Sequence, residues 1–462
     1  MNCSGYTQRC LARFVIEAVT PLSIGSGEKD IITDALVATD VNGLPYIPGS
    51  AVAGVVRHMI EAVNPEGFDT NSFFGFQDGD KGKGSEIIFT EAKILNSKGE
   101  VMDGMRLNVF GDDLLKHYAD LPIRQHVRIN EKGVADNAGK FDEQIVFAGT
   151  RFCFELEMVA DNDSISSFDH VLEMFLSSTF RIGGGTHKGF GAIKVVDLQK
   201  MTLDLEDDCQ RQQYLSKSSK LNTDFWKQDY QSPKTDGTHD GWTKYELKLS
   251  PEDFFLFGSG FGDEDADITP VKGKKVFWTD GIGTMKENLV LIPASSVKGA
   301  LTHRVAYHYN RLNGRFVGCS GEKAPKVGKD NEAVQVLFGS EGERVNRKTV
   351  NQKRGNLLLS DLIEDEMKDK ILNHVAIDRF TGGAMDGALF TEKTTYGKGH
   401  PLTLEIMAKN EVLNDETIRD AFEEAMKDIC KGLLPLGGGV NRGNGVFTGC
   451  LIKEGELVYE NK

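Results

Sequence analysis

The sequence predicts an α+β fold that occurs twice along the chain. Two observations lead to this prediction: a glycine-rich motif that recurs with the same spacing, and strand-like and helix-like segments that alternate in the same order in both halves. The motif reads GGGTHKGFG at 183–191 and GGGVNRGNG at 437–445. Three further pairs occur in the same order: IPGS at 47–50 with IPAS at 292–295, FFG at 73–75 with LFG at 337–339, and HVRIN at 126–130 with HVAID at 374–378. Chance explains one such pair, but not four in order, so we expect a duplicated domain.

The elements of the two halves correspond one by one. Each half opens with a strand-like segment and continues, after a glycine-containing loop and the Ile-Pro turn, into a helix with apolar residues at helical spacing. We take Ser50 as the N-cap of the first of these helices, and Ser295 precedes the second. Strands are expected at 11–20, 86–89, 152–156 and 192–196, and at 245–250, 356–359, 402–406 and 446–452; further helices are expected near 168–176 and 416–430. Interleaved elements of this kind predict a sheet covered by helices on one face.

The domain boundaries follow from the repeat. We expect a first domain at residues 1–200 and a second at 244–462, each long enough to bury its own core. Residues 201–243 are polar and lack periodicity, so they are expected to form the linker.

Composition excludes several classes of protein. A net charge of −15 argues against loose, nonspecific binding of nucleic acid, although a local basic groove stays compatible with it. The 7 cysteines contain no Cys-x-x-Cys pair, which is typical of a reducing cytoplasm and argues against a cysteine zinc site. No apolar run approaches the roughly 20 residues that span a bilayer. We therefore expect a cytoplasmic protein with no membrane partner.

The glycine motifs have two interpretations. Glycines such as Gly184 and Gly185, or Gly438 and Gly439, allow exposed backbone N–H groups to form a concave anion site, and a cation, Lys188 or Arg442, precedes the fourth glycine. A phosphate would suit such a site, and its repetition indicates a polyanion that passes both units. The alternative is a tight structural turn. Neither motif matches a P-loop or opens a dinucleotide-binding unit.

The order of these motifs resembles the RAMP superfamily of CRISPR–Cas proteins. The shared features are Gly-Ser-Gly, an aspartate, N-G-L-P-Y-I-P-G-S (42–50), a helix with Arg57, Phe-Gly, and the glycine motif. More narrowly, the chain resembles two fused backbone subunits of type III effector complexes, as in type III-D variant systems. The resemblance implies a modified RRM (ferredoxin-like) core in each half and a thumb-like β-hairpin at about 124–146 and 373–396. It also implies a prokaryotic cytoplasmic protein whose partners are guide RNA, single-stranded target RNA and other effector subunits.

The resemblance also suggests where target RNA is cut. In the family, an aspartate in the loop after the first strand acts with a divalent metal. Asp34 and Asp267 lie at the same offset beyond Gly27 and Gly260, and we expect both to be catalytic and to anchor Mg²⁺ or Mn²⁺. RNA supplies its own nucleophile, the 2′-hydroxyl. The alternatives are a solvated acidic loop and, in the second half, Asp265 in place of Asp267, because an insertion at 272–288 follows it.

A wider set of residues is expected to contact RNA by the same resemblance. Each half departs from the family's helix motif, with Ala53 in place of a lysine and Thr302 in place of an arginine. Two alternative functions stay open: a guide-RNA scaffold without catalysis, and a metal-independent guide-processing nuclease that uses histidine. The expected RNA-binding residues are Ser50, Arg57, His126, Arg128, Gly184, Gly185, Lys188, Ser295, Lys298, Arg304, Arg379, Gly438, Gly439 and Arg442.

Overall fold

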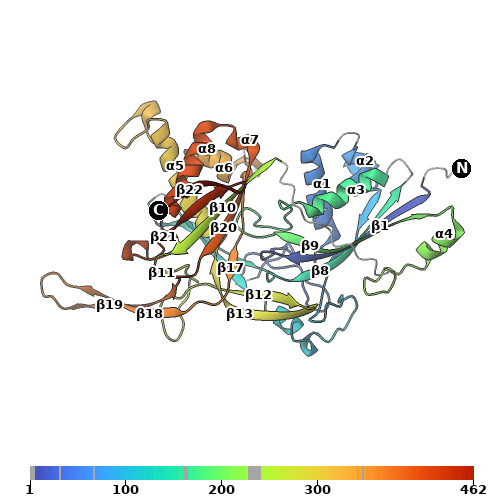
Figure 1. Ribbon diagram of the computed structural model, residues 1–462, viewed down its shortest axis with the longest axis horizontal. Helices are drawn as coiled ribbons and strands as arrows, with labels where there is room; N and C mark the ends of the chain where they lie inside the picture. Colours follow the sequence, from blue (N-terminus) through green and yellow to red (C-terminus); the bar gives the residue numbers. More distant parts are fainter. Residues whose placement is uncertain are drawn as a thin grey trace.

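Two five-stranded antiparallel sheets, one from each half of the chain, organise the computed structural model (Figure 1). The structure describes residues 6–30, 33–65, 68–130, 132–160, 165–226, 241–340, 342–345, 348–350 and 352–461. The first sheet has the order β4-β8-β1-β9, and β5 also pairs with β8. Its strands are β1 (Gln8–Ala18), β4 (Ile87–Phe89), β5 (Lys93–Ile94), β8 (Arg151–Ala160) and β9 (Ile193–Asp204).

The second sheet repeats this arrangement. Its order is β16-β20-β10-β21-β22, so that β10 lies between β20 and β21 as β1 lies between β8 and β9. The strands are β10 (Trp242–Pro251), β16 (Leu357–Leu359), β20 (Leu402–Lys409), β21 (Phe447–Lys453) and β22 (Glu456–Glu460). The duplication in the sequence is therefore present in the strand order as well.

Helices follow the same positions in both halves. The chain runs strand, helix, strand, strand, helix, strand, with α1 (Gly49–Val63) and α3 (Ile165–Leu176) in the first half and α5 (Ala294–Leu312) and α8 (Glu416–Cys430) in the second. The shorter helices are α2 (Thr70–Phe74), α4 (Asp208–Leu215), α6 (Glu332–Phe338) and α7 (Asn410–Leu413). Among the described helices, none is long and apolar enough to cross a membrane.

Each half has its own apolar core between sheet and helices. In the first, Phe14 of β1 stacks on Phe154 of β8 with ring centroids 5.1 Å apart, and Phe175 of α3 packs against both. In the second, Tyr245 of β10 meets Phe422 of α8 edge to face at 5.6 Å. The alternation of apolar residues along β1 and β10 places these rings on the face that the helices cover.

The N-terminus of α1 differs from the prediction. The N-cap is Pro48 and makes no side-chain capping bond, so Ser50 lies inside the first turn rather than at the cap. A Cβ at Gly49 would lie 2.2 Å from the carbonyl oxygen of Phe89, which explains the glycine there. In α5, the N–H of Ala294 is instead capped by a side chain from another segment, Asp361 Oδ1, at 2.8 Å.

The segment expected to be a linker is partly structured. Residues 201–204 continue β9, α4 follows, and Trp226 is buried with its Nε1–H donating to Glu155 Oε1 at 2.7 Å. Residues 227–240 lie outside the described residues. The polar composition did not reveal this packing, because few residues carry it: Leu221 is also buried against the first unit, and Lys217 pairs with Glu155.

The insertion at 272–288 forms a β-hairpin that joins the two halves. It consists of β12 (Lys272–Thr279) and β13 (Ile282–Ile292), and β17 (Leu362–Glu364) pairs with β13. Val276 of β12 is 1% exposed and belongs to the core of the first half. The Trp278 Nε1–H donates to the carbonyl of Gly149 at 2.8 Å.

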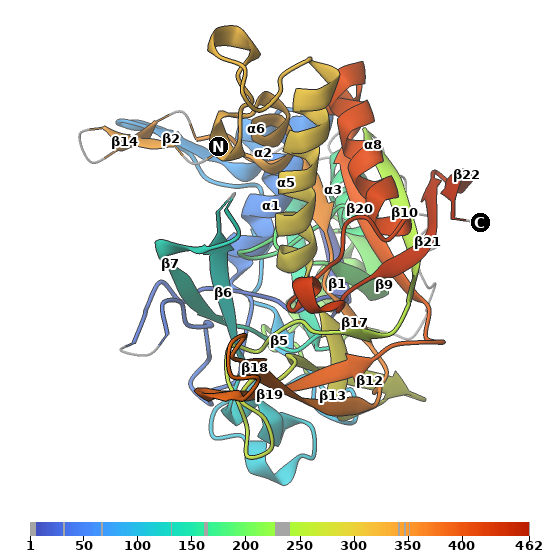
Figure 2. The same cartoon turned by 90° about the vertical axis from the view of Figure 1, so that its left-hand side faces the viewer.

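Two longer hairpins occur at corresponding places. The first pairs β6 (Ile123–Ile129) with β7 (Ala135–Gln144), and the second pairs β18 (Asp369–Ile377) with β19 (Ala384–Tyr396), which also pairs with β11 (Phe254–Phe255). In Figure 1, β18 and β19 extend away from the second sheet, and Figure 2 views the molecule from that side. Two short hairpins, β2 (Phe76–Asp78) with β3 (Lys81–Lys83) and β14 (Glu343–Val345) with β15 (Lys348–Val350), complete the described strands.

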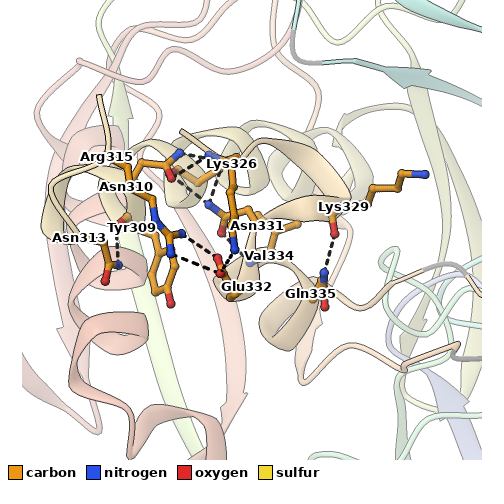
Figure 3. Close-up of polar contacts among 11 residues, drawn as sticks. Tyr309, Asn310, Asn313, Arg315, Lys326, Lys329, Asn331, Glu332, Val334 and Gln335 are labelled. Atoms are coloured by element: carbon orange, nitrogen blue, oxygen red, sulfur yellow. Dashed lines mark hydrogen bonds and ion pairs between the residues drawn. The ribbon is translucent and has the colours of Figure 1, made fainter. Parts of the chain in front are cut away.

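The connection between α5 and α6 is held by polar contacts (Figure 3). Glu332 accepts from Arg315 Nη1 at 3.0 Å and also pairs with Lys326. Asn331 caps α6 by accepting from the N–H of Val334 at 3.2 Å. Burial opposes ionisation of Glu332, but the bonds from Lys326 and Arg315 outweigh it and lower its pKa to about 2.

Candidate functional site

The two aspartate loops are attached to the two long hairpins in the same way. Asp34 is exposed, and its Oδ2 accepts from the backbone N–H of Asp142 on β7 at 3.1 Å. Asp267 is also exposed, and its Oδ2 accepts from the N–H of Thr391 on β19 at 2.7 Å and from the Thr391 hydroxyl at 2.9 Å. These bonds, led by the backbone N–H of Thr391, lower the pKa of Asp267. The structure therefore places both aspartates at the same point of a hairpin.

A cluster of a histidine, a phenylalanine and a glutamate lies at each hairpin next to the aspartate. His126 stacks on Phe141 at 4.7 Å in the first half, and His374 stacks on Phe390 at 4.9 Å in the second. The glutamate two residues after each phenylalanine faces the histidine: Glu143 Oε1 lies 2.9 Å from His126 Nε2, and Glu392 Oε1 lies 3.8 Å from His374 Nε2. All three residues of the cluster occupy matching positions in the two halves.

The cations of the glycine motifs reach the same clusters. Lys188 Nζ lies 4.2 Å from the centre of the Phe141 ring and 4.0 Å from Glu143 Oε1. Arg442 lies 5.5 Å from the Phe390 ring and pairs with Glu392. Burial opposes ionisation of Glu143, but His126 and Lys188 outweigh it and hold the pKa of Glu143 below its usual value. Each cation is thus positioned beside an aromatic ring and a carboxylate.

The glycines themselves serve close backbone packing. Gly183 and Gly437 have φ of 88° and 93°, and a Cβ on either would lie 2.4 Å from a backbone oxygen, that of Ser23 or Leu256. The next amides, Gly184 and Gly438, donate to those same oxygens at 2.6 Å. The expectation that these two N–H groups are offered to an anion is therefore wrong, because they are already bonded. Gly185 and Gly439 accept from the N–H groups of Lys188 and Arg442 at 2.7 and 2.8 Å, respectively.

Positive charge gathers where the two halves meet. Burial, followed by the charge of Lys188, lowers the pKa of Lys298 to about 8. His187 bonds through Nδ1 to the carbonyl of Leu357 at 2.7 Å and accepts from Arg354 Nε at 2.7 Å. Burial and the nearby Arg354 hold the pKa of His187 at about 4, although the bond to Leu357 opposes this. A cavity of about 480 Å³ is lined by His187, Phe338, Gln352, Arg354 and Gly355.

The remaining expected RNA-binding residues are not brought into one place. Arg57 bonds to Glu61, Asn71 and the carbonyl of Gly75, and Arg304 pairs with Asp428 at 2.6 Å. His126 is buried, 7% exposed, and so is not presented at the surface. Arg128 and Arg379 are exposed on the hairpins, Ser50 is exposed in α1, and Ser295 is half-buried in α5.

Sequence reasoning missed four residues of the clusters: Phe141, Glu143, Phe390 and Glu392. The signal was available in the repeat, because Phe-Asp-Glu at 141–143 and Phe-Thr-Glu at 390–392 lie at a similar distance after the paired histidines. The match is only two residues long, and without the strand register it does not stand out from chance.

A metal ion at Asp34 or Asp267 would have few protein ligands. Within the described part of the chain, no group of three or more His, Cys, Asp or Glu side chains is arranged to hold a metal ion. The bonds to the hairpins use Oδ2 of both aspartates. This donor set fits a hydrated Mg²⁺ that takes one carboxylate oxygen from the protein and its other ligands from water and phosphate.

Comparison with known proteins identifies the family. The RAMP superfamily profile matches residues 15–194 and 282–448, one region in each half. No curated protein matches the chain. The two matched regions cover most of the chain and contain both aspartates' hairpin clusters, although Asp267 itself precedes the second region. The chain is therefore a tandem member of the RAMP superfamily, whose proteins generally bind CRISPR RNA and act in complexes of several subunits.

Proposed function

We propose that the chain is a guide-RNA-binding backbone subunit of a type III CRISPR effector complex and cleaves complementary target RNA at Asp34 and Asp267. One observation carries this proposal: in both halves an exposed aspartate is bonded to the second strand of a hairpin, next to a His-Phe-Glu cluster and a cation from the glycine motif. Both carboxylates are exposed, so they are accessible to RNA while the hairpin fixes their position.

The strand order supports a modified RRM fold for each unit. Both sheets arise from a strand-helix-strand-strand-helix-strand sequence with the first strand between the third and fourth, which is the ferredoxin-like topology. The hairpins β6–β7 and β18–β19 then correspond to the thumbs. Phe380 at the turn of β18–β19 is 99% exposed, and Val134 at the turn of β6–β7 is 60% exposed, so both tips have apolar side chains to place against bases.

The chemistry needs few groups. In this cleavage the RNA 2′-oxygen bonds to the adjacent phosphorus, the bond from phosphorus to the 5′-oxygen breaks, and the products are a 2′,3′-cyclic phosphate and a 5′-hydroxyl, with the 2′-hydroxyl proton transferred through water to the leaving oxygen. The step requires the phosphodiester to be held in line and the developing negative charge to be stabilised. A Mg²⁺ or Mn²⁺ ion at each aspartate would supply that charge stabilisation. The aspartate holds its position through the hairpin amide, and the cation beside the cluster, Lys188 or Arg442, attracts the RNA backbone to the hairpin root.

Single substitutions in the assembled complex test the proposal. We expect Asp34→Ala and Asp267→Ala each to remove one product from labelled target RNA, while guide binding is retained. Asp265→Ala distinguishes Asp267 from its alternative in the same loop: Asp265 is exposed and lies 3.4 Å from Lys393 Nζ, and we expect its variant to yield every product. EDTA should stop both cuts, and added Mg²⁺ or Mn²⁺ should restore them. If both aspartate variants yield every product, catalysis at these residues is wrong.

A scaffold without catalysis in the second unit is favoured by one observation. The Asp267 carboxylate already accepts two bonds from Thr391, an arrangement that stabilises a loop by itself. In that case Asp267→Ala would lower thermal stability and leave all products. A histidine-based nuclease is less well supported, since His187 has both ring nitrogens bonded and His126 is buried.

A further inference from the structure

Asp361 lies at the contact between the two units, where its backbone N–H and both of its carboxylate oxygens make contacts. It follows β16 in the second unit, and its side chain is 1% exposed. Its backbone N–H donates to the carbonyl of Gly189 at 3.1 Å, and its Oδ1 accepts from the N–H of Ala294 at 2.8 Å. Its Oδ2 lies 3.3 Å from Nη1 of Arg124 in the first unit. Asp361 therefore joins the glycine motif and the hairpin of the first unit to α5 of the second.

Arg124 connects this contact to the Asp34 site. It lies on β6 directly opposite Glu143 of β7, and its side chain is 9% exposed. The residue before Glu143 is Asp142, whose N–H holds the Asp34 carboxylate. A chain of direct contacts therefore runs from Asp361 through Arg124 and the β6–β7 ladder to Asp34.

Among the described residues, the second unit has no counterpart of the Arg124–Asp361 pair. In the first unit, Arg124 lies two residues before His126. The matching position in the second unit, two residues before His374, is Leu372, which has no charge. Among the described residues, a Cβ at Gly443 would meet nothing within 4 Å, whereas a Cβ at Gly189 would lie 2.2 Å from Asp361 Oδ1. The loop that carries Asp267 also meets the first unit, since a Cβ at Gly260 would lie 2.7 Å from Gln125 Oε1 and Lys140 Nζ lies 5.9 Å from the Phe261 ring. Gly260 and Phe261 are exposed, whereas the Arg124–Asp361 pair is buried.

The β12–β13 hairpin adds further bonds between the two units. Val276 N–H donates to the carbonyl of Ala148 at 2.9 Å, and Gly283 N–H donates to the carbonyl of Ser97 at 2.7 Å, so both strands of the hairpin are bonded to the first unit. A buried ion pair held between two such surfaces cannot relax into water. Removal of one partner leaves an uncompensated buried charge, whereas removal of both charges is often close to neutral.

We infer that Asp361 is a positioning residue for the Asp34 site: the second unit fixes, through Arg124, the hairpin that holds Asp34. The inference rests on the proposed function. Cleavage at Asp34 therefore depends on the buried Arg124–Asp361 pair, of which the Asp267 hairpin has no counterpart among the described residues.

Asp361→Asn tests this with little change of shape, because the amide oxygen still accepts from Ala294. In the assembled complex, we expect the Asp34-dependent product to form about ten- to a hundredfold more slowly, as for a displacement of about 1 Å. The Asp267-dependent product, formed in the same reaction, should keep its rate and shows that the variant is folded. Arg124→Gln should behave like Asp361→Asn, and the double variant should recover most of the lost rate.

The outcomes separate the two proposals. If Asp34→Ala removes a product but Asp361→Asn leaves its rate unchanged, the inference is wrong and the proposed function stands. Equal slowing of both products by Asp361→Asn would indicate a general loss of structure and would also overturn the inference. If neither Asp34→Ala nor Asp267→Ala removes a product, the proposed function fails, and the inference with it.

Discussion

Substitution of Val276 tests how much the stability of the first unit depends on a side chain from the second. It belongs to β12 of the second half, yet its side chain is 1% exposed inside the core of the first. Val276→Ala removes two methyl groups, worth about 0.8 kcal/mol each, and leaves part of their volume empty. We therefore expect the first unit to lose about 2 kcal/mol of unfolding free energy, or roughly 4–8 °C in Tm for a unit of this size.

Hydrogen exchange can assign that loss to one unit. Peptides from β1 and β8 should exchange faster in Val276→Ala, in proportion to the lost free energy, while peptides from β10 and β20 change less. Val305→Ala is the matched control, since Val305 is buried in the core of the second half. It should produce the reverse pattern. Unchanged exchange in β1 and β8 of Val276→Ala would refute the reasoning that this hairpin completes the first core.

Three further predictions follow from charge and backbone geometry. Lys298 has a pKa of about 8 and should lose its charge between pH 7 and 9, so the affinity for RNA should fall over that range. In a binding titration, Lys298→Arg should remove this dependence of affinity on pH. Gly445→Ala should destabilise the second unit by several kcal/mol in urea unfolding, because its Cβ would lie 2.0 Å from the Leu436 carbonyl at a φ of 77°. The pKa of Glu332 is lowered to about 2, so its contribution to the unfolding free energy is full above about pH 5 and is lost as the pH falls towards 2. The unfolding free energy of Glu332→Gln should therefore depend less on pH in this acidic range.

The duplication and the positions of most sheet strands can be read from the sequence. Strand and helix positions follow from apolar periodicity and from turn residues that lie close together in the chain, and the predicted strands overlap β1, β8, β10 and β20. Such features are readable because each depends on neighbours within a few residues. The two hairpins and the two aspartate loops were instead expected from the resemblance of the motif order to the RAMP superfamily.

Tertiary structure alone decided how the halves meet. The pairing of Arg124 with Asp361, and the burial of Val276 in the opposite unit, join residues more than a hundred positions apart in sequence. No local pattern encodes them, and in the sequence the insertion at 272–288 is only a departure from the repeat. The glycine motifs show the same limit, since five repeated glycines predict close backbone approach but not whether the partner is a phosphate or, as at Gly184, the protein's own carbonyl.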